Sequence, residues 1–232
     1  GDHYWVNHVG IYTVPFRVAV NFNIPLVIFG EQPQFEYGGP KHSRTNYVMD
    51  RAWRQEFGLM RGLREEDMVD TDVSMVDLDM LTYPTDDEMK QVLGTFYGYF
   101  FKWDAATHVE LVKDLGWKPW PKVPVGAWLD YENTDVQWID IRERMKFLKY
   151  GYARVTDQLN IAIRAGRITR EEALPIAIER DGQVAEESIA SFCDYLEISK
   201  SHYFKVMDSF VNQEIFRRVG DCNEWELRKP RC

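Results

Sequence analysis

An uninterrupted apolar run at residues 26–29, Leu-Val-Ile-Phe, ends at Gly30 and is followed directly by the carboxylate of Glu31. A short β-branched and aromatic run bounded by turn residues predicts a strand that is buried on both faces, as in a parallel sheet. Open α/β sheets bind their ligands beyond the carboxyl ends of the strands, on loops such as the one that continues to the Gly-Gly-Pro turn at residues 38–40. Glu31 is therefore a candidate site residue. A helix cap or a surface salt bridge is an equally weighted alternative for it.

A second strand is predicted at residues 95–101, where the sequence Thr-Phe-Tyr-Gly-Tyr-Phe-Phe is aromatic nearly throughout. Lys102 and Asp104 follow this run, and a helix is expected over residues 105–115. Asp104 fits the N-cap of that helix, a role worth about 1 kcal/mol. Lys102 has no such structural role, so it is the better candidate for a ligand contact, for example with a phosphate.

Helical patterns surround the two predicted strands. Apolar residues recur at three- and four-residue spacing over residues 9–22, where Pro15 is expected to kink the helix or to mark its first turn. A helix is also predicted over residues 45–57, and the acidic residues 64–87 are expected to form short helices with solvated or capping carboxylates. Helices that alternate with buried strands predict an α/β fold for this part of the chain.

The second part of the chain reads as helical throughout. Three prolines stiffen residues 117–125, which makes this connector the predicted boundary between a domain at residues 1–125 and a helical domain at residues 126–232. The periodicity predicts helices at about 136–165, from Thr169 with Glu172 as a capping box, at 185–197 and at 200–212, followed by an irregular tail.

A polar stripe interrupts the apolar pattern of the long helix predicted at residues 136–165. Lys146, Tyr150, Arg154 and Asp157 follow one another at spacings of four, four and three, which places them on one helix face. Most stripes of this kind are solvated surface. The combination of a phenol, a guanidinium, an ammonium and a carboxylate nevertheless suits the binding of an anionic or sugar ligand.

Composition excludes several classes of function. The formal net charge of -9 argues against a general nucleic-acid binder, because no basic excess is available to neutralise phosphates. The three cysteines lack metal or disulfide spacing, the five histidines are scattered, and no metal site is predicted. No signal peptide and no apolar run of membrane-spanning length is recognisable, so we expect a cytoplasmic protein without a membrane partner.

Several segments resemble the N-acetyl sugar amidotransferases, a family within the PP-loop ATP pyrophosphatase superfamily. The residues that carry the resemblance extend in order over most of the chain. They are Gly1-Asp2-His3, residues 8–12, 17–19 and 24–26, Gly30-Glu31, residues 36–39, 98–100, 102–104 and 131–133, Lys146-Phe147, residues 150–157, and the segment from Arg164 to Glu172. The Gly-Glu loop and the Lys-Tyr-Gly-Tyr-Ala-Arg-Val-Thr-Asp segment are the most specific of these.

The resemblance implies a fold, a reaction and a set of site residues. The fold would be part of a PP-loop (HUP-like) parallel sheet with flanking helices, followed by an α-helical C-terminal domain. The reaction would convert an acetamido group on a nucleotide-activated sugar into an acetamidino group, with ATP and Mg²⁺ to adenylate the amide and ammonia from a partner glutaminase, in lipopolysaccharide O-antigen or other bacterial surface glycan biosynthesis. The implied residues are catalytic Glu31, Lys102 and Asp104; substrate-binding Glu36, Tyr37, Gly38, Gly39, Lys146, Tyr150, Arg154 and Asp157; and cofactor-binding Gly30 and Glu31.

Two features depart from the family pattern. The ATP-binding Ser-Gly-Gly-x-Asp-Ser loop does not occur in this sequence, and Tyr4 and Asn7 stand where the family has a pair of cysteines. We therefore expect the chain to be the C-terminal portion of such an enzyme, with an upstream part absent and no ATP chemistry of its own.

Two other functions remain as alternatives. The chain would be a non-catalytic docking module for a glutaminase if the surplus of aromatic side chains at Trp117, Trp120, Trp128 and Trp138 faced a partner. Transfer RNA thiolation is another PP-loop activity, and the acidic composition argues against it. Self-association into a homo-oligomer is left open.

Overall fold

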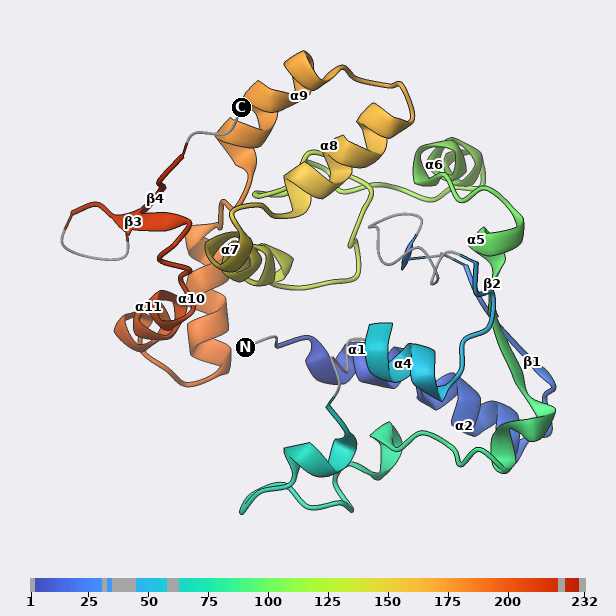
Figure 1. Cartoon of the computed structure of the whole chain (residues 1–232). Helices are drawn as coiled ribbons and strands as arrows, with labels where there is room; N and C mark the ends of the chain where they lie inside the picture. The colour runs from blue at the N-terminus through green and yellow to red at the C-terminus, as the bar shows by residue number, and fades with distance from the viewer. Residues whose placement is uncertain (1–2, 31–32, 35–44, 58–62, 221–223, 230–232) are drawn as a thin grey trace. The chain divides into compact units, whose positions relative to one another are not determined.

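The computed structural model of the chain describes residues 3–30, 33–34, 45–57, 63–220 and 224–229. Two compact units are distinguished, residues 1–105 (unit 1) and residues 106–232 (unit 2). Figure 1 labels their helices and strands. The division between the units lies N-terminal of the domain boundary predicted after residue 125, because the helix before the proline-rich connector groups with the second unit.

Unit 1 begins with two short helices in place of the single helix predicted over residues 9–22. Helix α1 spans Trp5–Ile11 and helix α2 spans Val14–Asn21. Pro15 lies in the first turn of α2, where its missing N–H leaves no helical acceptor unsatisfied. Of the two roles expected for Pro15, the structure therefore shows the start of a helix. Thr13, fully buried at the break, donates its N–H to the carbonyl of Gly10 at 3.1 Å.

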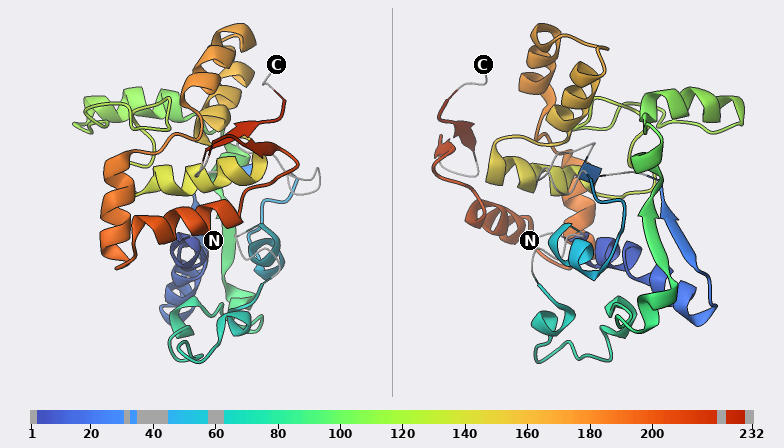
Figure 2. Two further views of the ribbon diagram at one scale, coloured as in Figure 1. Left: turned by 90° about the vertical axis from the view of Figure 1, so that its left-hand side faces the viewer. Right: turned by 45° about the vertical axis from the view of Figure 1, so that its right-hand side comes forward.

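A parallel pair of strands forms the sheet of unit 1. Strand β1, Leu26–Phe29, pairs with strand β2, Leu93–Phe96, over the full length of both, and the two lie side by side in Figures 1 and 2. The strand predicted at residues 26–29 is confirmed. Membership of a PP-loop sheet stays a prediction, since only this parallel pair is present among the described residues of unit 1.

The prediction that residues 26–29 are buried on both faces is wrong for the described structure. Leu26 and Ile28 are 44% and 57% exposed. Val27 and Phe29 point the other way and pack against a cluster that includes Phe16. Successive side chains of a strand point to opposite faces, so β1 has one covered face and one open face.

The aromatic segment after β2 is helical, and the strand predicted over residues 95–101 is correct only at its start. Helix α5, Tyr97–Phe100, is a single turn. The rings of Tyr97 and Phe101 stack with their centroids 4.6 Å apart, a contact that the four-residue spacing of a helical turn allows. Gly98 donates its N–H to the carbonyl of Gly30 at 2.9 Å, so the chain leaves the strand ladder at this point. The strand propensity of aromatic residues is therefore not followed here, as is common where tertiary contacts compete with it.

The acidic part of unit 1 consists of short helical turns, as the sequence predicts. The 3₁₀-helices are η2, Glu65–Met68, η3, Asp79–Leu81, and η4, Glu88–Gln91. Helix α4, Arg51–Phe57, precedes them, so the helix predicted over residues 45–57 is wrong for residues 45–50, where Val48 instead forms a bridge with Thr95 of β2. Carboxylates cap several of these helices. Asp50 accepts the N–H of Trp53 at 2.8 Å, and Glu88 accepts the N–H of Thr85 at 2.7 Å.

Arg54 is the buried centre of unit 1, with an exposed fraction of 1%. Its Nε donates to the hydroxyl of Thr13 at 2.9 Å. Its Nη2 donates to Glu65 Oε1 at 2.6 Å and to the carbonyl of Leu81 at 2.9 Å. The guanidinium also lies 5.1 Å from the centre of the Tyr83 ring. One side chain therefore connects α4 with the α1–α2 break, η2 and η3.

Unit 2 is mainly helical and ends in a small hairpin. Its elements are α6, Ala105–Asp114; α7, Ile139–Tyr150; α8, Arg154–Arg164; α9, Arg170–Arg180; α10, Glu186–Tyr195; α11, Lys200–Ser209; and the antiparallel strands β3, Phe216–Arg218, and β4, Trp225–Leu227. The hairpin replaces the irregular tail expected from the sequence. Within the described ranges, no helix combines the length and the apolar character needed to cross a bilayer.

The long helix predicted over residues 136–165 is two helices, α7 and α8, separated by an extended corner (Figure 2). Gly151 ends α7 in the left-handed conformation, with φ 80°, and donates its N–H to the carbonyl of Phe147 at 2.7 Å. This is the ordinary way in which a glycine stops a helix. The apolar stripe consequently serves two cores, one around Ile141 and Leu148 and another around Val155 and Leu159.

The capping box predicted for α9 is confirmed. The hydroxyl of Thr169 accepts the N–H of Glu172 at 3.2 Å, and Glu172 Oε2 accepts the N–H of Thr169 at 2.9 Å. Cys193 lies on the buried side of α10 with an exposed fraction of 3%, in the same cluster as Ile189 and Tyr203. Burial raises the pKa of this thiol, as expected for an inert core cysteine.

Candidate functional site

The corner between α7 and α8 is held by a carboxylate from the end of α9. Ala153, the N-cap of α8, has no side chain that can cap the helix. Asp181 Oδ2 accepts the N–H of Ala153 at 3.0 Å and the hydroxyl of Thr156 at 2.6 Å. Asp181 is 6% exposed. A carboxylate at this position satisfies free N–H groups and interacts favourably with the helix dipole, so it fixes where α8 begins.

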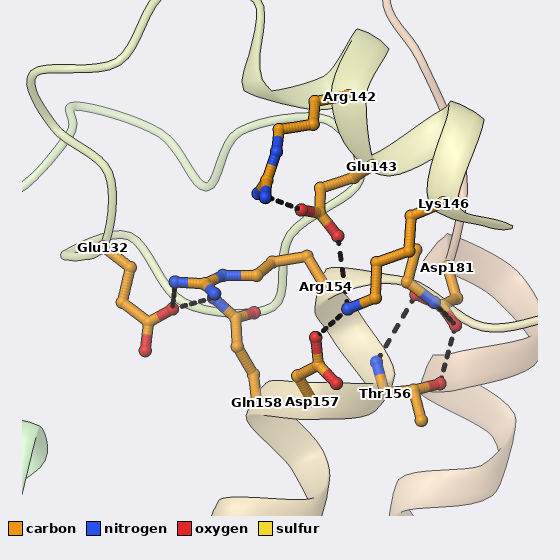
Figure 3. Close-up of polar contacts among 10 residues, drawn as sticks. Glu132, Arg142, Glu143, Lys146, Arg154, Thr156, Asp157, Gln158 and Asp181 are labelled. Atoms are coloured by element: carbon orange, nitrogen blue, oxygen red, sulfur yellow. Dashed lines mark hydrogen bonds and ion pairs between the residues drawn. The ribbon is translucent and has the colours of Figure 1, made fainter. Parts of the chain in front are cut away.

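Lys146 of α7 lies between two carboxylates at this corner (Figure 3). Its Nζ contacts the carboxylate of Asp157 on α8 and lies 3.8 Å from Glu143 Oε2, one turn earlier on α7. Arg142 Nη1 lies 3.4 Å from the other oxygen of Glu143. We name the group formed by these residues and the neighbouring Arg154–Glu132 pair the charge cluster. Its members are Glu132, Arg142, Glu143, Lys146, Arg154 and Asp157.

Arg154 and Gln158 attach the preceding loop to α8. Arg154 Nη2 donates to Glu132 Oε2 at 2.6 Å, and Gln158 Nε2 donates to the same oxygen at 2.8 Å (Figure 3). The Gln158 carbonyl accepts the N–H groups of Trp128 and Leu129 at 2.7 and 3.3 Å. Gln158 is 2% exposed, so its amide is a buried support for the more accessible ion pair beside it.

Glu143 is the most buried carboxylate of the charge cluster, with 4% of its side chain exposed. Burial raises its pKa, and the positive charges of Lys146, Arg142 and Arg154 oppose that effect. Its Oε2 makes no hydrogen bond to any residue that the structure describes. A carboxyl group with a raised pKa beside a lysine has the composition of a proton-transfer pair, and such pairs are concentrated at functional sites.

Three positive and three negative side chains balance one another in the charge cluster. The cluster therefore stabilises the α7–α8 corner without a ligand. Lys146, Arg154 and Asp157 keep 27%, 17% and 17% of their side chains exposed. These three groups can reach a ligand at the rim, whereas Glu143 is covered.

The comparisons with known proteins concern the part of the chain that contains this cluster. Residues 126–230 match the family model described as LPS biosynthesis protein WbpG-like, C-terminal domain. This is the WbpG-like segment. The match connects it with lipopolysaccharide biosynthesis, and the whole charge cluster lies inside it. A search of curated proteins found no match to the chain.

Three of the four polar residues predicted on one helix face meet in the WbpG-like segment, but for a different reason. Lys146 belongs to α7, while Arg154 and Asp157 belong to α8, so no common helix face exists. Tyr150 has an exposed fraction of 47%, and its ring centroid lies 6.4 Å from that of Tyr152. Tyr152 lies nearer the cluster, with its ring centre 5.0 Å from Lys146 Nζ.

The site residues predicted at the strand ends are placed in part by unit 1. Gly30 directly follows β1, and a Cβ atom there would lie 3.0 Å from the Trp103 ring, so the glycine allows this close packing. Lys102 Nζ lies 3.8 Å from Asp104 Oδ2, with side chains 82% and 15% exposed. Their catalytic and cofactor-binding roles stay predictions. The remaining predicted residues, Glu31, Glu36, Tyr37, Gly38 and Gly39, lie outside the described residues.

Glu143, Gln158 and Asp181 were not identified from the sequence. Glu143 had a readable signal, because it stands three residues before Lys146 on a predicted helix, the spacing at which side chains interact. Gln158 and Asp181 had none. Their partners are 26 and 25 residues away in the sequence and become neighbours only through the packing of α8 against the loop and α9.

The ATP and Mg²⁺ that the family resemblance implies stay predictions. No three or more His, Cys, Asp or Glu side chains within the described residues are arranged to hold a metal ion. The cation at the strand end, Lys102, already faces Asp104.

Proposed function

We propose that this chain is part of an N-acetyl sugar amidotransferase in lipopolysaccharide biosynthesis. The enzyme would replace the oxygen of an acetamido group on a nucleotide-activated sugar by nitrogen, with ammonia from a partner glutaminase. The match of residues 126–230 to the WbpG-like C-terminal domain is the observation that carries this proposal. The resemblance of segments along most of the chain to sugar amidotransferases supplies the reaction.

In this proposal the rim of the charge cluster binds the sugar substrate. Arg154 and Lys146 would contact its anionic or hydroxyl groups, since charge-assisted hydrogen bonds are the strong ones. Asp157 would accept a sugar hydroxyl. Glu143, whose side chain is 4% exposed, would position Lys146 and favour its charged form. ATP-dependent activation would require the phosphate-binding loop that this sequence lacks.

Binding of a nucleotide-activated N-acetyl sugar tests the assignment of the cluster. Titration calorimetry with UDP-N-acetylglucosamine should show weaker binding to Arg154→Ala and Lys146→Ala, by about tenfold or more, as the loss of a charged hydrogen bond predicts. Arg217→Ala is the matched control, because Arg217 pairs with Glu226 on the exposed hairpin. Equal affinities for the wild-type protein and both cluster variants would show that the sugar does not bind there.

Turnover tests the reaction itself. The protein as its gene encodes it would be incubated with ATP, an ammonium salt and a nucleotide-activated N-acetyl sugar, and mass spectrometry would follow the exchange of oxygen for an imino group together with release of AMP. We expect Glu143→Gln to lower kcat more than KM, because Glu143 acts through Lys146. Formation of AMP without a modified sugar would refute the amidotransferase assignment.

Three of the four tryptophans named for the alternative of a glutaminase-docking module have contacts within unit 2. Trp138 donates its indole N–H to the hydroxyl of Ser191 at 2.8 Å and packs on the core of α10 and α11. Trp120 donates to the carbonyl of Glu132 at 3.3 Å. Trp128 packs against the cluster around Leu159. These indoles are engaged within unit 2, so they are poor candidates for a partner surface.

A further inference from the structure

The WbpG-like segment contains a cavity of about 240 Å³ that the charge cluster does not use. Side chains of α7, the α9–α10 turn, α11 and β4 line it. Polar and aromatic residues of its wall include Arg144, Tyr203, Phe204, Asp208 and Trp225. Ligand sites combine apolar and aromatic walls with a few polar groups, and this cavity has that composition.

Arg144 brings an uncompensated positive charge to the cavity wall. Its Nη1 donates to the carbonyl of Gly182 at 3.1 Å, and its guanidinium lies 5.6 Å from the centre of the Phe147 ring. Among the described residues it forms no ion pair with a carboxylate. Burial lowers its pKa, which reflects the cost of keeping the charge there.

Asp208 is the carboxylate of the cavity wall, and other groups already engage it. Its Oδ2 accepts from Arg218 Nη2 at 2.8 Å, and its Oδ1 accepts from the indole of Trp225 at 2.7 Å. The charge of Asp208 is thus matched by Arg218, and that of Arg144 is not. The cavity wall has a net positive character.

Tyr203 is the second polar residue of the cavity wall, and its hydroxyl is not used in a hydrogen bond to a described residue. The exposed fraction of Tyr203 is 4%. Burial raises the pKa of Tyr203 to about 12, and the nearby charge of Arg144 acts in the opposite direction. The hydroxyl therefore keeps its proton at neutral pH and can donate a hydrogen bond.

We propose that this cavity is a second ligand site, which binds a monosaccharide carrying a carboxylate or a phosphate. Arg144 would bind the anionic group, Tyr203 would donate a hydrogen bond, and the rings of Phe204 and Trp225 would contact the sugar carbons. The volume is below the roughly 300–1,000 Å³ typical of drug-sized ligands, so it suits a single ring. The site is separate from the charge cluster and does not depend on the proposed function.

A turn at Gly182 shapes one wall of the cavity and requires a glycine. Gly182 has φ 73°, and a Cβ atom on it would lie 2.3 Å from Cγ of Phe147. Only glycine allows this conformation and this approach together. The resulting turn presents its carbonyl to Arg144 and so holds the guanidinium at the wall.

NMR titration of the full chain tests the proposal, with the indole N–H signal of Trp225, assigned through Trp225→Phe, as the reporter. The probes are glucuronate, glucose 1-phosphate, inorganic phosphate and neutral glucose. We expect one of the two charged sugars to shift the signal saturably and to bind at least about tenfold more tightly than glucose. The better of the two identifies the anionic group.

Two variants and one control complete the experiment. Arg144→Gln, which keeps a donor for Gly182, should weaken binding by about tenfold, and Tyr203→Phe by a few-fold. Arg180→Gln on α9 is the control, because Arg180 is absent from the cavity wall. The proposal fails if neither charged sugar shifts the signal, if glucose binds equally well, if inorganic phosphate alone binds as tightly, or if the folded Arg144→Gln and Tyr203→Phe variants both bind normally.

Discussion

The two units each bury charged side chains, and they do so in different ways. Arg54 of unit 1 has its charge matched by Glu65 and its donors engaged by Thr13 and Leu81. Glu143 of unit 2 lies between Arg142 and Lys146 at longer distances of 3.4 and 3.8 Å, and one of its oxygens has no hydrogen bond among the described residues. A buried charge with every partner in place supports the fold. A buried charge with an unsatisfied hydrogen-bonding atom costs stability, and it is the stronger indication of a functional role.

We expect the largest loss of stability from substitution of Arg54, whose charge and hydrogen-bond donors all have partners. Arg54→Ala leaves the Glu65 carboxylate buried and unpaired, so the free energy of unfolding of unit 1 should fall by about 3–5 kcal/mol. Urea denaturation measures this loss. Lys90→Ala is the control: Lys90 pairs with Asp87, their side chains are 74% and 87% exposed, and an exposed ion pair is worth about 0–1 kcal/mol. Equal losses in the two variants would contradict the idea that burial and full pairing distinguish Arg54.

We expect an intermediate loss of stability from substitution of Arg154, which forms an ion pair near the surface of unit 2. Arg154→Ala removes a hydrogen bond to Glu132, whose oxygen keeps the bond from Gln158. The loss of unfolding free energy should be about 1–2 kcal/mol, since Glu132 stays partly hydrated. Denaturation of Arg154→Ala and Arg54→Ala under the same conditions compares the two units directly. A loss at Arg154 as large as that at Arg54 would remove the contrast between them.

Glu143→Gln is expected to change the free energy of unfolding least at acidic pH. The informative measurement is how this change depends on pH. Burial raises the pKa of Glu143 above its usual 4.5, so the folded state binds more protons than the unfolded state between these two values. The stability of the wild-type protein should therefore fall as the pH rises through this window, and the cost is fully present above it. Glutamine cannot ionise, and Lys146 keeps Asp157 as its partner.

Thermal unfolding of both proteins across this pH range measures the difference. Glu143→Gln should match the wild-type protein at the acidic end and exceed it near neutrality, by about 1.4 kcal/mol for each pKa unit of the shift. Asp157→Asn serves as a comparison at the more exposed end of the cluster. A variant that is less stable than the wild-type protein at every pH would show that Glu143 is a fully compensated structural charge like Arg54.

Local sequence patterns predicted the elements well wherever neighbours in the chain decide them. The strand at residues 26–29, the helix over 105–115 and the Thr169 capping box depend on contacts within a few residues. The aromatic run at residues 95–101 was misassigned after Phe96: Tyr97–Phe100 is a helical turn, in which Gly98 bonds to the distant Gly30. Side-chain propensity alone cannot reveal such a contact.

In the candidate site, too, the local sequence predicted some features and distant contacts decided others. Lys146, Arg154 and Asp157 were selected by their chemistry and by an assumed common helix face. The glycine at position 151 ends α7 and brings Lys146 to Asp157 across a corner instead. The signal for a break was present in Gly151, since glycine favours the left-handed conformation that stops a helix. Where the second helix would then point depended on Asp181, which the local sequence does not connect with it.

The sequence by itself determined the strand at residues 26–29, most of the helices of unit 2 and the Thr169 cap, and it showed that lysine, arginine and aspartate near residue 150 are suited to a polar ligand. These properties follow from side-chain chemistry and short-range spacing. Only the tertiary structure decided that Glu143 is buried with a raised pKa, and that Arg144 and Tyr203 border one cavity. Burial, dielectric environment and unmatched charge are properties of packed neighbours distant in the chain, and for that reason no local pattern specifies them.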